Sequence, residues 1–137
     1  MKNNESCPRI IDFESIGSAD IGYISVAEGD SLPFEVKRVY WTYYTPQDVE
    51  RGNHAHKNLQ QILVAVSGVI DLKIETASGE TYHFVLDSPT RGVYLPSMCW
   101  RTIKYSHNAV QMCLANMEYD ESDYIRDFNE FTEDRQL

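Results

Sequence analysis

Two histidines lie one residue apart in the stretch RGNHAHKNLQQ, residues 51–61. On a β-strand, residues two apart point to the same face, so His54 and His56 are expected to converge on one side of a sheet. A pair of imidazoles in this arrangement could hold a metal ion, transfer protons, or fill a core as a structural pair. The residues around the pair decide between these uses.

The surroundings resemble the first motif of cupin barrels, in which a glycine precedes HxH, an acidic residue follows, and a second glycine closes the hairpin. Gln60 and Gln61 stand where the acidic residue is expected. The second cupin motif, PxGxxH, supplies the last metal ligand and would fall on residues 96–101, which places Arg101 where the histidine would be. A neutral amide and a guanidinium cannot complete such a ligand set, so we expect no metal.

Three other residues could in principle replace the lost ligand. His83 and His107 fall on other expected strands or turns and are predicted to be surface residues. Cys99 is predicted to be a small hydrophobic residue of the core.

Without a metal, two imidazoles with an ordinary pKa of about 6.5 suit the removal of a proton from one atom and its return to a neighbouring atom. This is the chemistry of isomerases and epimerases. It requires a substrate with an acidic C–H bond, such as one beside a ketone, and no cofactor.

Length and composition indicate the number of domains, the cellular compartment and the kinds of partner that this protein can have. The 137 residues fit one domain, residues 1–137, and three cysteines without paired spacing indicate a reducing cytoplasm. No stretch is long and apolar enough to cross a bilayer. The net charge of −9, from 21 acidic and 12 basic residues, disfavours nucleic acid and anionic membranes as partners. An anionic ligand must therefore meet locally clustered arginines.

Short apolar runs separated by turn residues predict the elements that position these groups. Strands are expected at 22–28, 35–44, around 54–56, and at 61–68, 69–76, 81–87, 92–97, 101–106 and 109–116. Their number and spacing favour an all-β sandwich, barrel or jelly roll.

Large side chains occupy both faces of the expected strand 35–44, so we expect it to be covered on both sides. One face carries Val39, Trp41 and Tyr43, and the other carries Arg38, Tyr40, Thr42 and Tyr44.

In the C-terminal segment, the spacing of the apolar residues changes from that of a strand to that of a helix. In residues 120–131, Tyr124, Ile125, Phe128 and Phe131 recur at helical spacing after Asp120 and Ser122 as possible caps, which predicts a short helix packed on the barrel.

The chain as a whole is similar to the WxcM-like family of cupins, the nucleotide-sugar 3,4-ketoisomerases. Four segments carry the resemblance in order: LPFEVKRVYW, RGNHAHKNLQQILVAVSG, LDSPTRGVYLPSMCW and YDESDYIRDFNEF. The resemblance implies a cupin-type double-stranded β-helix (jelly roll), a homodimer with exchanged strands, and no metal. It implies that the substrate is dTDP-4-keto-6-deoxy-D-glucose, a dTDP-linked 4-keto-6-deoxyhexose. The ketone would move from carbon 4 to carbon 3, and the product would serve 3-amino sugar biosynthesis.

Within this resemblance, His54 and His56 are assigned to the proton transfers, in an order that the sequence does not fix. Tyr40 could relay the oxygen-bound proton. Either Gln61 or Gln60 could bind the enediol intermediate through a hydrogen bond.

The arginines are expected to bind or stabilise negative charge on the substrate. Arg51 and Arg38 could bind the pyrophosphate, and Arg101 should point into the cavity of the histidines, where it could stabilise the enediolate. Trp100 would then face outward by alternation, and Tyr94 and Tyr23 could be stacking groups.

Three alternatives remain open at this stage: a nucleotide-sugar 3,5-epimerase, a non-catalytic cupin that binds sugar or nucleotide, and a metal-dependent cupin enzyme. The galacto or gluco configuration of a ketoisomerase product is also left open, because both arise from the same enediol.

Overall fold

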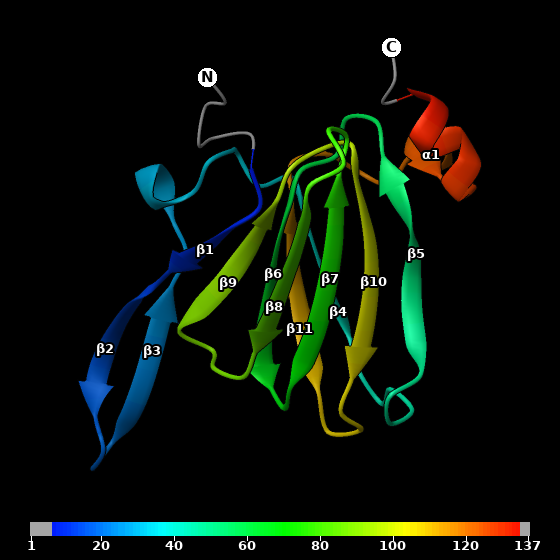
Figure 1. The fold of residues 1–137 in the computed structure, drawn as a ribbon. Helices are drawn as coiled ribbons and strands as arrows, with labels where there is room; N and C mark the ends of the chain where they lie inside the picture. The colour runs from blue at the N-terminus through cyan, green and yellow to red at the C-terminus, as the bar shows by residue number, and fades with distance from the viewer. Residues whose placement is uncertain (1–6, 135–137) are drawn as a thin grey trace.

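The computed structural model describes residues 7–134, which form two facing antiparallel sheets and a hairpin that projects from one side (Figure 1). This confirms the predicted all-β class. The first sheet has the order β1-β9-β6-β11-β4, and the second has the order β12-β5-β10-β7-β8. Strands β2 and β3 pair only with each other among the described strands.

The first sheet contains β1 (Arg9–Asp12), β9 (Arg91–Leu95), β6 (Gln61–Ser67), β11 (Val110–Ala115) and β4 (Arg38–Thr42). The second contains β12 (Tyr124–Ile125), β5 (Glu50–His56), β10 (Cys99–Tyr105), β7 (Ile70–Thr76) and β8 (Thr81–Leu86). The hairpin, called the arm below, consists of β2 (Glu14–Ser18) and β3 (Gly22–Val26). Helix α1 (Phe128–Asp134) follows β12, and two 3-10 turns lie at Gly29–Ser31 and Glu121–Asp123.

The main core lies between the two sheets and follows the alternation of the strands. In β7, Ile70, Leu72 and Ile74 are buried, while the residues between them point away from the core. Burying each such aliphatic side chain contributes roughly 1.5–3 kcal/mol. Thirteen buried residues form this core cluster, and Tyr40 and Phe84 are among the half-buried residues packed on it.

The C-terminal helix is shorter than predicted. The prediction was wrong for Tyr124 and Ile125, which form β12 by pairing with His56 and Ala55 at the edge of β5. The pairing satisfies backbone groups that an unpaired edge would leave open, and Ile125 is fully buried in a small cluster with Ala55 and Phe131. None of the described helices is both long and apolar enough to span a membrane.

Strand β4 has one open face. Arg38, Tyr40 and Thr42 are half-buried and point toward the second sheet. Val39 and Trp41 on the other face are 46% and 61% exposed. The prediction that both faces are covered is therefore wrong for the single chain.

Candidate active site

A cavity of about 310 Å³ opens between the two sheets, and strands β4, β5, β6, β10 and β11 supply most of its wall. Most of the side chains singled out from the sequence line this cavity: Arg38, Tyr40, Arg51, His54, Gln61 and Arg101. Tyr119 and Tyr124, from the segment that follows β11, complete the wall.

A β-bulge in β5 brings Arg51 and His54 to the same face. These residues are three positions apart and would point to opposite faces of a regular strand. In the pairing of β5 with β10, His54 lies opposite Arg101 but Gly52 lies opposite Thr102, so Asn53 is an extra residue. Gly52 and Asn53 have φ of 86° and 55°, a left-handed conformation that glycine and asparagine tolerate. The sequence analysis missed this bulge, although the Gly-Asn pair was a signal for it.

The bulge also fixes the protonation pattern of His54. The Nδ1 atom of His54 lies 2.9 Å from the carbonyl oxygen of Gly52. A carbonyl can only accept, so Nδ1 carries the hydrogen and donates it. In a neutral imidazole this leaves Nε2 with a free lone pair, which is the form that a general base requires.

Three polar side chains form a chain across the cavity floor. Arg101 donates to the amide oxygen of Gln61 through Nη1 and to the carbonyl of Cys99 through Nη2 at 3.3 Å. Gln61 in turn donates its amide to the hydroxyl oxygen of Tyr40 at 2.7 Å. The Tyr40 oxygen accepts this bond, so its own hydrogen is available to another acceptor.

Arg101 is the central charge of the site. Its side chain is only 2% exposed, and none of the described carboxylates lies within ion-pair distance of it. Its Nε–H is buried without a hydrogen-bond partner among the described residues. Burying an uncompensated cation is costly, so the cavity is prepared to receive an anion or a developing negative charge.

Burial and the charge of Arg101 together keep the histidines neutral. Burial, followed by the positive charge of Arg101, lowers the pKa of His54 to about 4. Burial and Arg101 also lower the pKa of His56 to about 2. Burial raises the pKa of Tyr40 well above 10, so its hydroxyl stays protonated. At neutral pH, the site therefore holds two neutral imidazoles, a neutral phenol and a guanidinium.

His56 does not line the cavity with His54. Its side chain is 1% exposed and lies behind that of His54, with the two ring centroids 4.9 Å apart and the rings nearly perpendicular. The Nδ1 atom of His56 lies 3.3 Å from Oδ2 of Asp123, and the ring of Tyr124 contacts both imidazoles. The sequence analysis placed Asp123 and Tyr124 in the predicted helix and missed their contact with the histidines. Their position in the segment YDESDYIR was the available signal.

The other two arginines occupy different depths. Arg38 is half-buried, and its guanidinium lies 5.1 Å from the ring centroid of Tyr40. Arg51 is exposed and lines the cavity from the outer part of β5. The cavity thus has a basic lining in a chain that carries a net charge of −9.

Several other residues considered from the sequence lie outside the cavity. Gln60 accepts a hydrogen bond from the hydroxyl of Tyr94 on the far side of the first sheet, so Gln61 is the glutamine that faces the histidines. Tyr23 is exposed on the arm. Trp100 faces outward, as predicted, and packs on Phe128 of α1.

The residues considered as substitute metal ligands also lie elsewhere. His83 is exposed and bonded to Asp71, and His107 bonds to the carbonyl of Thr45, while Cys99 is buried in the core. Among residues 7–134, no three His, Cys, Asp or Glu side chains are grouped in a way that could hold a metal ion. The amide oxygen of Gln61, a potential ligand, is already bound by a guanidinium.

Comparison with known proteins shows the family to which this chain belongs. A family model described as "FdtA: WxcM-like, C-terminal" matches residues 6–136. The chain belongs to this WxcM-like family. The resemblance noted in the sequence is thereby confirmed.

Three proteins named as sugar oxo- or ketoisomerases are similar to this chain along most of their length. A TDP-4-oxo-6-deoxy-alpha-D-glucose-3,4-oxoisomerase from Aneurinibacillus thermoaerophilus is 34% identical over 124 residues, which are 90% of this chain and 88% of that protein. The sugar 3,4-ketoisomerase QdtA from Thermoanaerobacterium thermosaccharolyticum, solved in complex with TDP, is 30% identical, with a TM-score of 0.88 and 94% of each chain covered. The TDP-quinovose 3,4-ketoisomerase WlaRB from Campylobacter jejuni is 34% identical, with a TM-score of 0.86 and coverage of 92% of this chain and 97% of that one. These similarities also confirm the predicted cupin-type fold.

The bulge predicts a specific effect of a methyl group at Gly52. A Cβ there would lie 3.0 Å from the carbonyl oxygen and 3.1 Å from Cγ of Arg101, whereas a Cβ at Gly79 would meet no atom within 4 Å. Both glycines have positive φ, so alanine at either should cost roughly 1–2 kcal/mol of unfolding free energy. Gly52→Ala should cost more than Gly79→Ala in urea unfolding, and only Gly52→Ala should shift the NMR signals of His54. Equal costs with unchanged His54 signals would contradict this account of the bulge.

The electrostatic account predicts the titration of His54. In an NMR pH titration, the midpoint of His54 should lie near 4. Arg101→Met removes the positive charge and should move the midpoint upward toward 6.5. Arg91→Met removes an exposed arginine that pairs with Asp12, and should leave the midpoint unchanged. An unchanged midpoint in Arg101→Met would show that Arg101 does not set the basicity of His54.

Proposed function

We propose that this protein is a TDP-sugar 3,4-ketoisomerase that moves the ketone of TDP-4-keto-6-deoxy-D-glucose from carbon 4 to carbon 3. One observation carries the proposal. A neutral imidazole with a free Nε2 lone pair shares a cavity with a buried guanidinium that has no carboxylate partner among residues 7–134. A base beside a fixed positive charge suits a reaction that passes through an enediolate. The similarity to 3,4-ketoisomerases over at least 90% of the chain supports the same reaction.

In the first half of the reaction, a histidine removes the hydrogen on carbon 3, which is acidic because it neighbours the carbon-4 ketone. We assign this step to His54 because it is the histidine that lines the cavity. Negative charge then develops on oxygen 4, where the Arg101 guanidinium stabilises it. Tyr40, protonated because burial raises its pKa, can donate its hydroxyl hydrogen to that oxygen.

In the second half, the proton on oxygen 3 leaves and carbon 4 accepts a proton, which gives a ketone at carbon 3 and a hydroxyl at carbon 4. The isomerisation needs no net gain or loss of protons or electrons. His54, charged after the first step, can exchange its proton with the solvent and then deliver a proton to carbon 4, and Tyr40 can recover a proton from oxygen 3. The chain itself supplies every group in this scheme, and neither a metal nor another cofactor takes part.

The arginines near the cavity would bind the nucleotide portion. Arg51, exposed at the cavity, and Arg38, half-buried beside Tyr40, can pair with pyrophosphate oxygens. We propose thymidine diphosphate as this portion because TDP is bound in the structure of the related ketoisomerase QdtA.

We place the reaction in the cytoplasm, where the product would supply an aminotransferase that forms a 3-amino sugar. The three cysteines, Cys7, Cys99 and Cys113, are free thiols, which suits a reducing compartment.

The reaction can be tested by proton NMR of the purified protein with TDP-4-keto-6-deoxyglucose in heavy water. We expect a 3-keto product with solvent deuterium at carbon 4. His54→Ala should reduce the rate by about 10²–10⁴-fold because it removes the base. His83→Ala, the same change at an exposed histidine, should leave the rate unchanged. The value of kcat/KM should stay level below pH 6.5 and fall only as the pH approaches 4, because His54 remains an unprotonated base above that value.

Other outcomes of this experiment favour the alternatives. A 4-keto product with inverted centres at carbons 3 and 5 would indicate an epimerase. Unchanged substrate together with tight binding of TDP would indicate a sugar-nucleotide-binding protein without catalysis.

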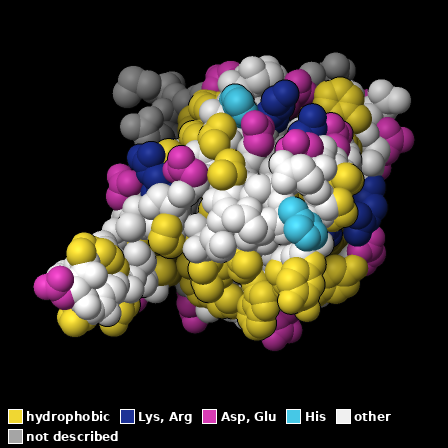
Figure 2. Space-filling view, turned by 90° about the horizontal axis from the view of Figure 1, so that it is seen from below, with side chains coloured by type: hydrophobic (Ala, Val, Ile, Leu, Met, Phe, Trp, Pro, Cys, Tyr) yellow, Lys and Arg dark blue, Asp and Glu magenta, His cyan; other side chains and the backbone are white. Residues whose placement is uncertain are grey.

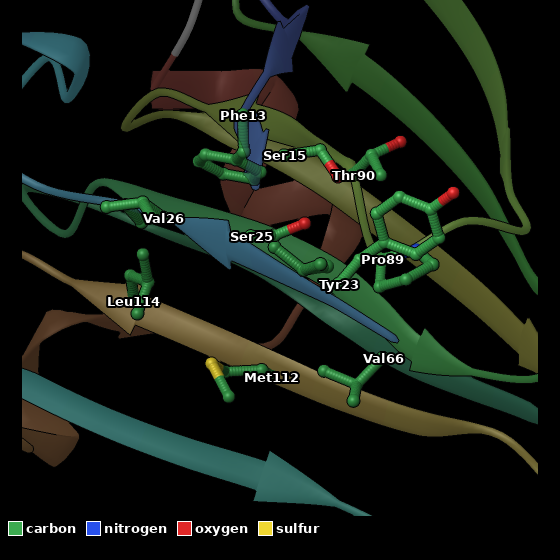
Figure 3. A pocket seen from close by; sticks show the side chains of 12 residues that line it. Phe13, Ser15, Tyr23, Ser25, Val26, Val66, Pro89, Thr90, Met112 and Leu114 are labelled. Atoms are coloured by element: carbon green, nitrogen blue, oxygen red, sulfur yellow. The ribbon is translucent and has the colours of Figure 1, made fainter. Parts of the chain in front are cut away.

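We further propose that two copies of the chain form a dimer by exchanging their arms. The arm carries exposed Ile16, Tyr23 and Ile24, at 51%, 65% and 65%, although an isolated two-stranded hairpin is only marginally stable. A space of about 510 Å³ lies between the arm and the outer face of the first sheet, lined by Tyr23 and Val26 of the arm and by Val66 and Met112 of the sheet (Figure 3). Hydrophobic side chains gather on the arm and along a margin of the main body (Figure 2). A partner's arm would cover this surface and the open face of β4.

Light scattering after size exclusion can test the dimer. The unmodified chain should have twice the monomer mass of 15.8 kDa. Trp41→Asp or Ile24→Asp should give monomers, because each puts a charge into the proposed contact. Val85→Asp provides a control, since Val85 is 50% exposed on β8 of the other sheet. A monomeric unmodified chain, or dimers in all three variants, would contradict the proposal.

A further inference from the structure

The buried histidine of the pair has its own partner. His56 lies beside Asp123, whose side chain is 3% exposed, with Nδ1 and Oδ2 3.3 Å apart. This is a close electrostatic contact and not a hydrogen bond, because neither ring nitrogen of His56 has a hydrogen-bond partner among the described residues. Three N–H groups donate to this carboxylate. Oδ1 accepts from the backbone and side-chain nitrogens of Asn58 at 2.8 and 3.2 Å, and Oδ2 accepts from the backbone of Leu59 at 3.1 Å. Asp123 is therefore held firmly against the loop between β5 and β6.

This contact selects one form of His56. N–H groups can only donate, so both carboxylate oxygens act as acceptors. The Nδ1 atom that faces Oδ2 must then carry a hydrogen, because a lone pair there would be repelled by the carboxylate. Burial and the nearby charge of Arg101 keep the ring neutral, with a pKa of about 2, so Nε2 has no hydrogen. The same form is present in His54, where the carbonyl of Gly52 selects it.

The two imidazoles are packed as one unit. The edge of one ring faces the plane of the other, at an angle of 89° between the planes. Tyr124, the neighbour of Asp123 in the sequence, contacts His56 and His54 with ring-centroid distances of 4.3 and 5.0 Å. A rotation of His56 would therefore displace the ring of His54 on the cavity wall.

From these contacts we infer that Asp123 is a positioning residue: its carboxylate fixes the ring plane and the Nδ1–H form of His56, and this ring holds His54 with Nε2 toward the substrate. His56 itself does not contact the substrate. The inference deepens the proposed ketoisomerase function and rests on it for its catalytic consequence. The part that concerns the form of His56 depends only on the contacts of Asp123.

Asp123→Asn tests the inference. The amide oxygen should stay with the two donors of Asn58, which turns the amide nitrogen toward Leu59 and His56. An N–H donor that faces Nδ1 favours the form of His56 that has a lone pair on Nδ1, so the ring hydrogen should move to Nε2. Long-range ¹H–¹⁵N spectra distinguish the Nδ1–H form from the Nε2–H form. We expect kcat to fall by about 10–100-fold, as when partners that orient metal-bound histidines are removed, with little change in KM. Asp120→Asn, in the same segment, should change neither quantity, because the exposed Asp120 carboxylate bonds only to Ser122 among the described residues, and the backbone bond from Asp123 to the Asp120 carbonyl is kept in this variant.

The outcomes separate positioning from a purely structural role. If Asp123 only ties the loop to the C-terminal segment, Asp123→Asn will lower the melting temperature. Well below that temperature, kcat and the form of His56 will be those of the unmodified protein, and the inference is overturned. An Nε2–H form of His56 in the unmodified protein also overturns it, and this measurement needs no folded variant.

The substrate-free spectra also separate this inference from the proposed function. If the unmodified protein does not convert the keto sugar, the ketoisomerase proposal fails. A change of His56 to the Nε2–H form in Asp123→Asn would still support the positioning of His56 by Asp123.

Discussion

The buried guanidinium of Arg101 is the charge on which the arrangement of the site depends. It sits on the core-facing side of β10, between the buried residues Cys99 and Ile103. A position of this kind normally carries an aliphatic side chain, and a cation there without a carboxylate lowers stability. The surrounding sequence compensates with neutral acceptors, the amide oxygen of Gln61 and the carbonyl of Cys99. Neutral acceptors hold the guanidinium in place without cancelling its charge, so that charge remains available to a ligand.

The fold places the reactive groups around this charge with ordinary strand geometry and one irregularity. Alternation in β4 and β10 directs Tyr40 and Arg101 inward from opposing sheets. The bulge at Asn53 then turns Arg51 to the face that carries His54. A regular strand in place of the bulge would remove either the arginine or the histidine from the cavity. The left-handed backbone at Gly52 and Asn53 is therefore part of how the site is built, because it puts two chemically different groups on one face of one strand.

The sequence was a good guide where a regular period dominated. Short apolar runs located most strands of both sheets, although not β1 or β12, and the HxH spacing predicted that His54 and His56 share one side of a strand. Prediction failed where tertiary contacts overrode local pattern. Tyr124 and Ile125 have helical spacing to Phe128, but the free edge of β5 pairs with them as a strand. Strand parity predicted that His54 and His56 can act on one substrate, and this stays a prediction. The pair does share a side of β5, but the depth of the site buries His56 against Asp123, and periodicity carries no information on depth.

Arg101 affects both partners of the proposed proton transfer. A positive charge beside His54 lowers the pKa of the imidazole and so weakens it as a base. The same charge stabilises the enediolate and so strengthens the carbon acid. The weaker base makes proton removal less favourable, and the stronger carbon acid makes it more favourable. Because both effects arise from the same guanidinium, they partly cancel in the free energy of proton removal. The remaining benefit is that the base stays unprotonated at neutral pH. The fixed charge also needs no reorganisation as the enediolate forms, and this preorganisation is the usual source of a large electrostatic contribution to catalysis.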